Sequence, residues 1–434
     1  MIKKLNLLSF FFLLLSCSFG DVGGFWSKEK SLDEKNSGFD QIFKNEKINE
    51  VKLNEDLKIS LIQYDYEKKE DSNLENDYGY VDFKNKLSKI SKYKFSKINN
   101  FDILSPNLVF YQNDIIFFDN KGTVLRFNEN SEIIWKLNIY TKDEKNSNPL
   151  LMLQSDEKNH LIIADNLGKY YSIDKDNGKL IWLKKHTSPF NSEIKIYDNK
   201  IYIIDSSNQI NCFLLKNGNK IWSFSSEKPF VSSFSKLSLA ISNDTIIFSN
   251  SIGEINALNA SNGTLRWQFL NSSHSSYKEI MTLNMSPLVI NENSIYFSTN
   301  KNKFYSLDFD SGAINWEQKI SSGLRPVVVD RLIFTVSEKG FLNVIEKISG
   351  NIIQIKKILR NTKFNKIKDS YLTGFIIDKN HLYITTSNGR LYIYSLSEKK
   401  IINQFKIDNE KISEPFINNN NMFVIKDNAI IRIR

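Results

Sequence analysis

Cysteine and histidine are the side chains best suited to nucleophilic or metal chemistry, and the sequence contains only two cysteines and four histidines. His160 and His381 occupy equivalent places before a strand, each within Asn-His-Leu, and so belong to a repeated pattern. His186 and His274 fall in separate connectors that lack the spacing of metal ligands. We therefore predict no metal site and no cofactor. Cys212 lies in an apolar run, which favours a buried side chain over a reactive thiol.

The other cysteine, Cys17, ends an N-terminal targeting segment. Lys3 and Lys4 precede an apolar run from Leu5 to Leu15, which is too short to remain as a membrane-spanning helix. The sequence Leu-Leu-Ser-Cys that ends at Cys17 resembles the bacterial lipoprotein box. This resemblance implies cleavage before Cys17, lipid on its thiol and new amino group, and, because serine follows, sorting to the outer membrane. An ordinary secretory signal with an accidental cysteine is the alternative.

Composition divides the remainder into two parts. Residues 17–85 are rich in Lys, Glu, Asp and Asn, with few apolar residues, and such a segment cannot bury enough surface to order itself. We expect a signal peptide over 1–16, a largely flexible, lipid-anchored tether over 17–85 and one folded domain over 86–434. The net charge of +9 comes from lysines spread singly among acidic residues, so we predict no nucleic-acid partner.

The folded part repeats a single pattern. A short strand, a tight turn containing glycine and a second strand ending in Trp run from Gly253 to Trp267, and nearly the same pattern recurs along the chain. The successive aromatic positions, or their worn equivalents, are 38 to 49 residues apart, which is the length of one four-stranded propeller blade. We expect these side chains to dock one blade on the next: Trp135, Trp182, Trp222, Trp267 and Trp316.

The two ends of the domain predict how the propeller closes. After the seventh repeat the chain offers three more strands, ending with Ala429 to Ile433, and the fourth is missing. An unpaired edge invites aggregation, so the missing strand must come from elsewhere in the chain. Residues 92–98 are the expected donor. The prediction is an all-β fold, an eight-bladed β-propeller of four-stranded antiparallel blades closed by pairing of the N- and C-terminal strands.

The run from Leu307 to Trp316 resembles the tryptophan-docking motif of PQQ-type propellers. Together with the lipoprotein box and the closing strands, the sequence resembles the BamB-like lipoproteins of the outer-membrane β-barrel assembly machinery. The resemblance implies a non-enzymatic scaffold on the periplasmic face of the outer membrane. It also implies binding to the periplasmic domains of the central barrel-inserting subunit, with nascent outer-membrane proteins as further partners.

The resemblance also implies where that partner binds. In the family, two loops before the first strands of the blades ending in Trp267 and Trp316 carry the contacts. Here the loops lack the Arg and Asp residues of better-known members, and the corresponding residues are Phe230, Val231 and Phe234 in the first loop and Thr282 and Asn284 in the second. Long links between blades fall on one face of a propeller, which favours that face for binding.

Two other functions stay open at this stage. A quinoprotein dehydrogenase of the same fold would need a quinone pocket with Ca²⁺ at the propeller centre and, by the family's pattern, a vicinal cysteine pair, which the sequence lacks. A periplasmic propeller that binds another ligand or a glycan would place aromatic residues in its central funnel. Because fold alone does not decide function, the repeats cannot separate these alternatives.

Overall fold

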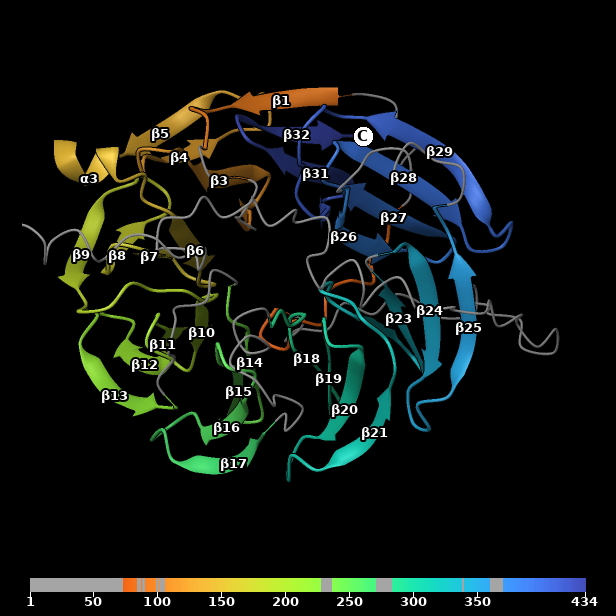
Figure 1. Ribbon diagram of the computed structural model, residues 1–434. Helices are drawn as coiled ribbons and strands as arrows, with labels where there is room; N and C mark the ends of the chain where they lie inside the picture. Colours follow the sequence, from red (N-terminus) through yellow and green to blue (C-terminus); the bar gives the residue numbers. More distant parts are fainter. Residues whose placement is uncertain are drawn as a thin grey trace, which may run out of the picture. The chain divides into compact units, whose positions relative to one another are not determined.

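The computed structural model describes residues 73–83, 87, 90–98, 101, 106–227, 236–270, 283–337, 339–359 and 370–434. All of them belong to one compact unit, residues 50–434. Within the described residues, no helix is long and apolar enough to cross a membrane. Eight four-stranded antiparallel sheets follow one another around a ring, and we number these blades 1 to 8 in chain order (Figure 1).

Blades 1 to 4 each use four consecutive strands. Blade 1 consists of β2 (Val109–Tyr111), β3 (Asp114–Phe118), β4 (Val124–Phe127) and β5 (Ile133–Leu137). Blade 2 consists of β6 (Leu151–Ser155), β7 (His160–Asp165), β8 (Lys169–Asp174) and β9 (Leu180–Lys185). Blade 3 consists of β10 (Lys195–Tyr197), β11 (Lys200–Ile204), β12 (Gln209–Leu214) and β13 (Lys220–Ser225). Blade 4 consists of β14 (Leu239–Ser242), β15 (Thr245–Ser249), β16 (Ile255–Asn259) and β17 (Leu265–Phe269).

Blades 5 to 7 repeat the same plan. Blade 5 consists of β18 (Val289–Asn291), β19 (Ser294–Thr299), β20 (Lys303–Asp308) and β21 (Ile314–Gln318). Blade 6 consists of β22 (Val327–Val329), β23 (Leu332–Val336), β24 (Phe341–Glu346) and β25 (Ile352–Lys357). Blade 7 consists of β26 (Leu372–Ile377), β27 (His381–Thr386), β28 (Arg390–Ser395) and β29 (Lys400–Lys406). A short helix, α3 (Lys142–Asn146), lies in the link between blades 1 and 2, where Thr141 and Glu144 form a capping box.

Blade 8 closes the ring with strands from both ends of the chain. Its sheet joins β1 (Ile90–Lys94) to β32 (Ala429–Ile433), followed by β31 (Asn421–Lys426) and β30 (Phe416–Asn418). Ile90 pairs with Ile433 and Lys94 with Ala429. Bonds from the amides of Phe95 and Ile98 to the carbonyls of Asn428 and Asp427 continue the contact. The predicted eight blades and their closure are confirmed, with the donor strand starting two residues earlier than expected.

The apolar core is divided among the interfaces between blades. Seven clusters of buried side chains fill these interfaces, and each combines residues of neighbouring sheets. One cluster, for example, joins Tyr202 and Ile204 of blade 3 to Leu239 and Phe248 of blade 4. The second and third strands of each blade are buried almost throughout, which explains why they are the most strongly apolar stretches of the sequence.

The five tryptophans of the repeat lie at these interfaces and share one geometry. In each case the indole Nε1 donates a hydrogen bond of 3.0 to 3.3 Å to a backbone carbonyl of the next blade. The ring covers the turn glycine of that blade, where a Cβ would lie 2.4 to 2.8 Å from ring atoms. A register shift next to the residue paired with each Trp marks a β-bulge, a device that re-aims a side chain. The residues concerned are Trp135, Trp182, Trp222, Trp267 and Trp316.

Residues 73–83 differ from the sequence-based domain boundary, which placed them in the flexible tether. Asn76 is fully buried, and Val81 and Phe83 belong to the core cluster between blades 7 and 8. The few apolar residues of this stretch pack among the inner strands. No local pattern in the sequence predicts this packing. The ordered part of the domain therefore begins at or before residue 73 rather than at 86, while Cys17 and the expected signal peptide lie outside the described residues.

Candidate functional site

The two faces of the propeller carry different connections. Because strands alternate in direction within a blade, the links between blades and the turns from second to third strands share one face, which we call the loop face. The turns from first to second and from third to fourth strands share the other, the turn face. The tryptophans dock on third-to-fourth turns, so the turn face is fixed by the repeat. The loop face is where the sequence departs from the repeat, and it is the candidate site.

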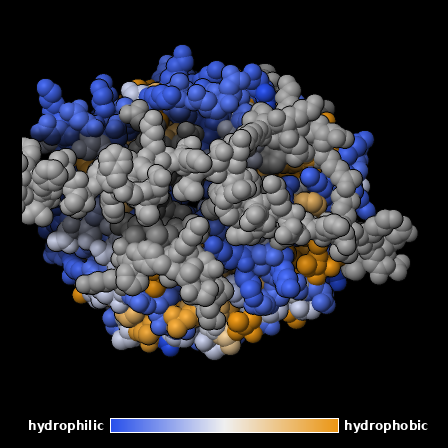
Figure 2. Space-filling model, in the orientation of Figure 1, coloured by the Kyte–Doolittle hydropathy of each residue, from blue (hydrophilic) through white to orange (hydrophobic). Residues whose placement is uncertain are grey.

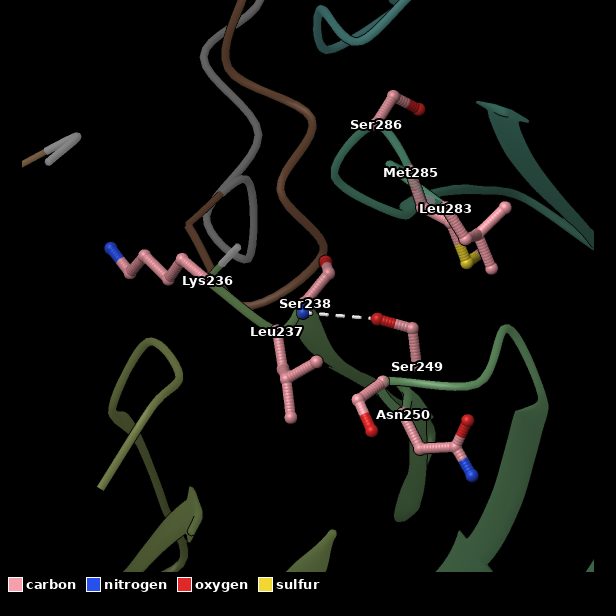
Figure 3. Close-up of a pocket in the computed structure, with 9 residues that line it drawn as sticks. Lys236, Leu237, Ser238, Ser249, Asn250, Leu283, Met285 and Ser286 are labelled. Atoms are coloured by element: carbon pink, nitrogen blue, oxygen red, sulfur yellow. Dashed lines mark hydrogen bonds between the residues drawn. The ribbon is translucent and has the colours of Figure 1, made fainter. Parts of the chain in front are cut away.

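A small hollow lies on the loop face between blades 4 and 5 (Figure 3). Its walls come from the last residues of the link into blade 4, the last residues of the link into blade 5, and the second-to-third turn of blade 4. The space measures about 20 Å³, enough for one or two water molecules and too small for a drug-sized ligand. The lining residues are Lys236, Leu237, Ser238, Ser249, Asn250, Ser251, Leu283, Met285 and Ser286.

Hydrogen bonds make the walls of this hollow rigid. The backbone amide of Ser238 donates to Ser249 Oγ at 3.1 Å, the bond drawn in Figure 3, and Ser238 Oγ accepts from the amide of Leu288 in blade 5 at 2.9 Å. Asn250 Oδ1 accepts from the amide of Glu254 at 3.0 Å, while its Nδ2 donates to the carboxylate of the same residue at 2.6 Å. Burial raises the pKa of Glu254. The roots of the two links are therefore held in a fixed relation.

The sequence-predicted contact residues lie mostly beyond these roots. Phe230, Val231, Phe234 and Thr282 fall outside the described residues. Asn284 is exposed beside the hollow, where its amide donates to Asn300 Oδ1 at 3.0 Å and its carbonyl accepts from the amide of Asn300 at 2.9 Å. Both predicted loops thus begin or end at the same hollow, a proximity that their separation in the sequence did not reveal.

A buried network of charges crosses the centre of the ring next to this hollow. Glu193 Oε1 lies 3.7 Å from Lys236 Nζ and 3.9 Å from Arg325 Nη2, and Glu193 Oε2 lies 3.4 Å from Lys195 Nζ. Arg325 Nη1 in turn lies 3.2 Å from Glu414 Oε2. These residues precede or open the inner strands of blades 3, 4, 6 and 8, so the network joins opposite sides of the ring.

The electrostatics of the network keep Glu193 and Lys195 charged at neutral pH. Burial alone would raise the pKa of Glu193, but the cations Lys236, Lys195 and Arg325 outweigh it and hold that pKa at about 2. Burial lowers the pKa of Lys195 to about 8, against the opposing effect of Glu193. A carboxylate with so low a pKa is a poor proton acceptor. Glu193 therefore suits the positioning of charges and not general base catalysis.

Histidines and cysteine show no arrangement for catalysis within the described residues. His186 Nε2 lies 2.9 Å from Asp205, His160 Nδ1 lies 2.7 Å from Asp156, and His381 pairs with Asp378 in another blade, while His274 lies outside the described part of the chain. The searched residues contain no group of three His, Cys, Asp or Glu side chains close enough to hold a metal ion. Cys212 is fully buried, and burial raises the pKa of its thiol to about 12.

Sequence reasoning missed the charged residues of the network and the polar walls of the hollow. Glu193, Arg325 and Glu414 occupy the positions just before an inner strand, in blades 3, 6 and 8. An alignment of the repeats would have shown that a charged residue precedes the inner strand in these three blades. Their pairing across the ring has no counterpart in sequence spacing, because the partners are up to 132 residues apart.

Exposed apolar side chains gather on the outer strands and do not mark this site. Leu265 of β17 and Ile314 of β21 are about half exposed, and Figure 2 shows apolar surface along the rim over these strands. Equivalent residues are exposed on the outer strands of most other blades, as expected of a position in the repeat. Single exposed apolar residues of this kind are normal on protein surfaces.

The fold and the tryptophan geometry define the class of protein: an eight-bladed β-propeller built of PQQ-like repeats. Residues 120–356, just over half of the chain, match the family model described as outer membrane protein assembly factor BamB. The chain therefore belongs to this family. The inner strands β14, β18 and β26, which an enzyme of this fold would use to surround a quinone, bond here to residues 73–83 of the same chain.

Individual relatives are distant. The outer membrane protein assembly factor BamB of Shewanella oneidensis is 19% identical over 271 residues, covering 62% of this chain and 66% of that protein. The BamB of Moranella endobia is 22% identical, covering 63% and 70%. The crystal structure of BamB from Moraxella catarrhalis superposes with a TM-score of 0.66 at 15% identity, covering 80% of this chain and 99% of that one. At this identity the structural match establishes the fold.

Proposed function

We propose that this chain is a non-enzymatic scaffold lipoprotein of the outer-membrane β-barrel assembly machinery, held at the periplasmic face of the outer membrane by lipid on Cys17. The observation that carries the proposal is the match of residues 120–356 to the assembly-factor family. The paired charges of the Glu193 network and the buried Cys212 thiol agree with a role in binding. The partner is the central barrel-inserting subunit.

The proposed docking surface is the loop face over blades 4 and 5. Two long links, 226–238 and 270–288, have their roots at one rigid hollow, so residues on both links can act on one partner surface. The hollow is too small to enclose a ligand, but its fixed polar rim suits the edge of a protein interface. Phe230, Val231 and Phe234 would supply the apolar anchors, and Thr282 and Asn284 the polar contacts.

The experiment is co-purification of the full-length protein from membranes with the barrel-inserting subunit. We expect the double variant Phe230→Ser and Phe234→Ser to lose the partner by at least about tenfold, which corresponds to about 1.4 kcal/mol or more, with the melting temperature nearly unchanged. Ile348→Ser is the matched control, because Ile348 is 83% exposed in a turn on the opposite face. Mass spectrometry of the same preparation should find an acylated Cys17 at the N-terminus.

Three results would contradict this assignment. Retention of the partner by the double variant would move the interface away from the loop face. Unfolding of the double variant would show that the two phenylalanines belong to the core. Loss of the partner by Ile348→Ser as well would mean that apolar surface in general, and not this face, is responsible.

A further inference from the structure

Residues 73–83 run across the innermost strands of the ring, where each blade has a free edge. The amides of Ile241 in β14 and Ile290 in β18 donate to the carbonyls of Leu74 and Glu75 at 3.0 Å. The amide of Ile377 in β26 donates to the carbonyl of Gly79 at 2.9 Å. In Figure 1 this orange-red segment lies inside the ring. The segment therefore satisfies backbone groups of three blades at an edge that has no neighbouring strand.

Asn76 is the centre of this contact. Its side-chain Nδ2 donates to the carbonyls of Leu239 at 3.1 Å and Leu288 at 2.9 Å, which belong to blades 4 and 5. Its Oδ1 accepts from Lys195 Nζ of blade 3 at 2.6 Å. Asn76 is fully buried and has a φ of 61°, a conformation that asparagine tolerates better than most residues. An amide supplies both the donors and the acceptor here, whereas a carboxylate could not donate to the two carbonyls.

Packing against neighbouring side chains determines which residues fit after Asn76. The ring of Tyr78 lies 4.0 Å from the guanidinium carbon of Arg325, and burial raises the pKa of Tyr78 well above its usual range. At Gly79 a Cβ would lie 2.3 Å from Val327 Cγ2, so any other residue would have to displace the Val327 side chain. Phe83 then packs edge-on against Tyr383, with ring centroids 5.4 Å apart.

We propose that the inner wall of blades 3 to 7 is a peptide-binding site, which this chain occupies with its own residues 73–83. The ligand is a peptide that forms a turn ending in asparagine at the position of Asn76, with an aromatic residue two places later and glycine after it. The same site accepts the same peptide in trans when the segment of the chain itself is displaced. This inference does not depend on the barrel-assembly partner.

The first test is amide hydrogen exchange on the full-length protein. The amides of Ile241, Ile290 and Ile377 should exchange slowly in the wild type. They should exchange roughly 10- to 100-fold faster in Asn76→Ala, which removes three buried hydrogen bonds. Asn73→Ala is the matched control, because the Asn73 side chain is exposed in the same turn, and it should leave the rates unchanged. Fast exchange of the three amides in the wild type would overturn the proposal without any variant.

The second test adds the peptide in trans. A fluorescent synthetic peptide with the sequence of residues 73–83 should bind Asn76→Ala protein, and it should bind wild-type protein at least about tenfold more weakly, since the wild-type site is filled. A peptide with aspartate in place of Asn76 should fail to bind either protein. If the native peptide does not bind a variant whose three amides have lost protection, or if the aspartate peptide binds equally well, the inner wall is not a peptide site.

Discussion

The interfaces that follow blades 1 to 5 and those around blades 6 to 8 are held by different contacts. After each of the first five blades, a Trp of the outer strand covers a turn glycine of the next blade and donates to one of its carbonyls. At the equivalent positions of blades 6 and 7 the residues are Gln354, which is buried, and Asn403, which is exposed. The repeat thus loses its docking residue in the last part of the ring.

The N-terminal part of the domain supplies contacts where the tryptophans are missing. Tyr80 packs against the core cluster between blades 6 and 7, and Val81 and Phe83 belong to the cluster between blades 7 and 8. Tyr93 of β1 is 1% exposed within the cluster that joins blade 8 to blades 1 and 2. The difference shows that interfaces without a docking Trp still contain buried apolar side chains, some of which come from another segment of the chain.

Removal of β1 should have the largest effect on this second region. Deletion of residues 90–98 removes the buried Tyr93 ring and uncovers the edge of β32, which together should cost more than about 5 kcal/mol of unfolding free energy and abolish cooperative unfolding. Deletion of residues 27–56 is the control, with no expected change. Thermal unfolding followed by circular dichroism distinguishes the two, and similar curves would show that blade 8 does not depend on β1.

Substitution of a docking tryptophan should have the next largest effect. Trp316→Ala removes a ring that is 9% exposed and should lower the unfolding free energy by about 3–5 kcal/mol. Asn403→Ala, at the equivalent position of blade 7, should change it by less than about 0.5 kcal/mol, because Asn403 is exposed. Equilibrium urea unfolding measures both. Equal losses of unfolding free energy for the two variants would show that the effect comes from the position in the blade and not from the indole ring.

The charge network should give a smaller, pH-dependent effect, because it links the two regions across the ring. The pKa of Glu193 lies near 2 in the folded protein, below its ordinary value of 4.5, so its contribution is fully present above pH 4.5 and is lost as the pH falls through 2. Glu193→Gln should therefore be less stable than the wild type at pH 7, by about 3 kcal/mol, and this difference should shrink between pH 4.5 and 2.

An ion pair with an exposed carboxylate provides the control for that measurement. Glu292 lies 2.9 Å from Lys347 Nζ, but its side chain is 75% exposed, so Glu292→Gln should cost less than about 1 kcal/mol. Urea unfolding at a series of pH values compares the two variants. A stability difference for Glu193→Gln that does not change between pH 4.5 and 2 would show that the network does not depress the pKa of this carboxyl.

The candidate site could be predicted from the sequence only in part. The links into blades 4 and 5 are visible as insertions between repeats, and Asn284 indeed lies exposed on the loop face. The hollow that joins the roots of the two links depends on Ser238, whose hydroxyl accepts a bond from an amide 50 residues away. The sequence pattern of the repeat does not predict that contact, because the two links come together only when the blades assemble into the ring.

The sequence by itself determined the repeat length, the number of blades, the docking tryptophans and the closure of the ring. Each of these rests on local patterns, namely alternating apolar residues, a turn glycine with positive φ and a Trp at fixed spacing, which one blade expresses without reference to the others. Only the tertiary structure decided that residues 73–83 belong to the domain and that Glu193 meets Arg325. Asn76 and Lys195 are 119 residues apart, and their contact exists because ring closure brings distant inner strands around one axis.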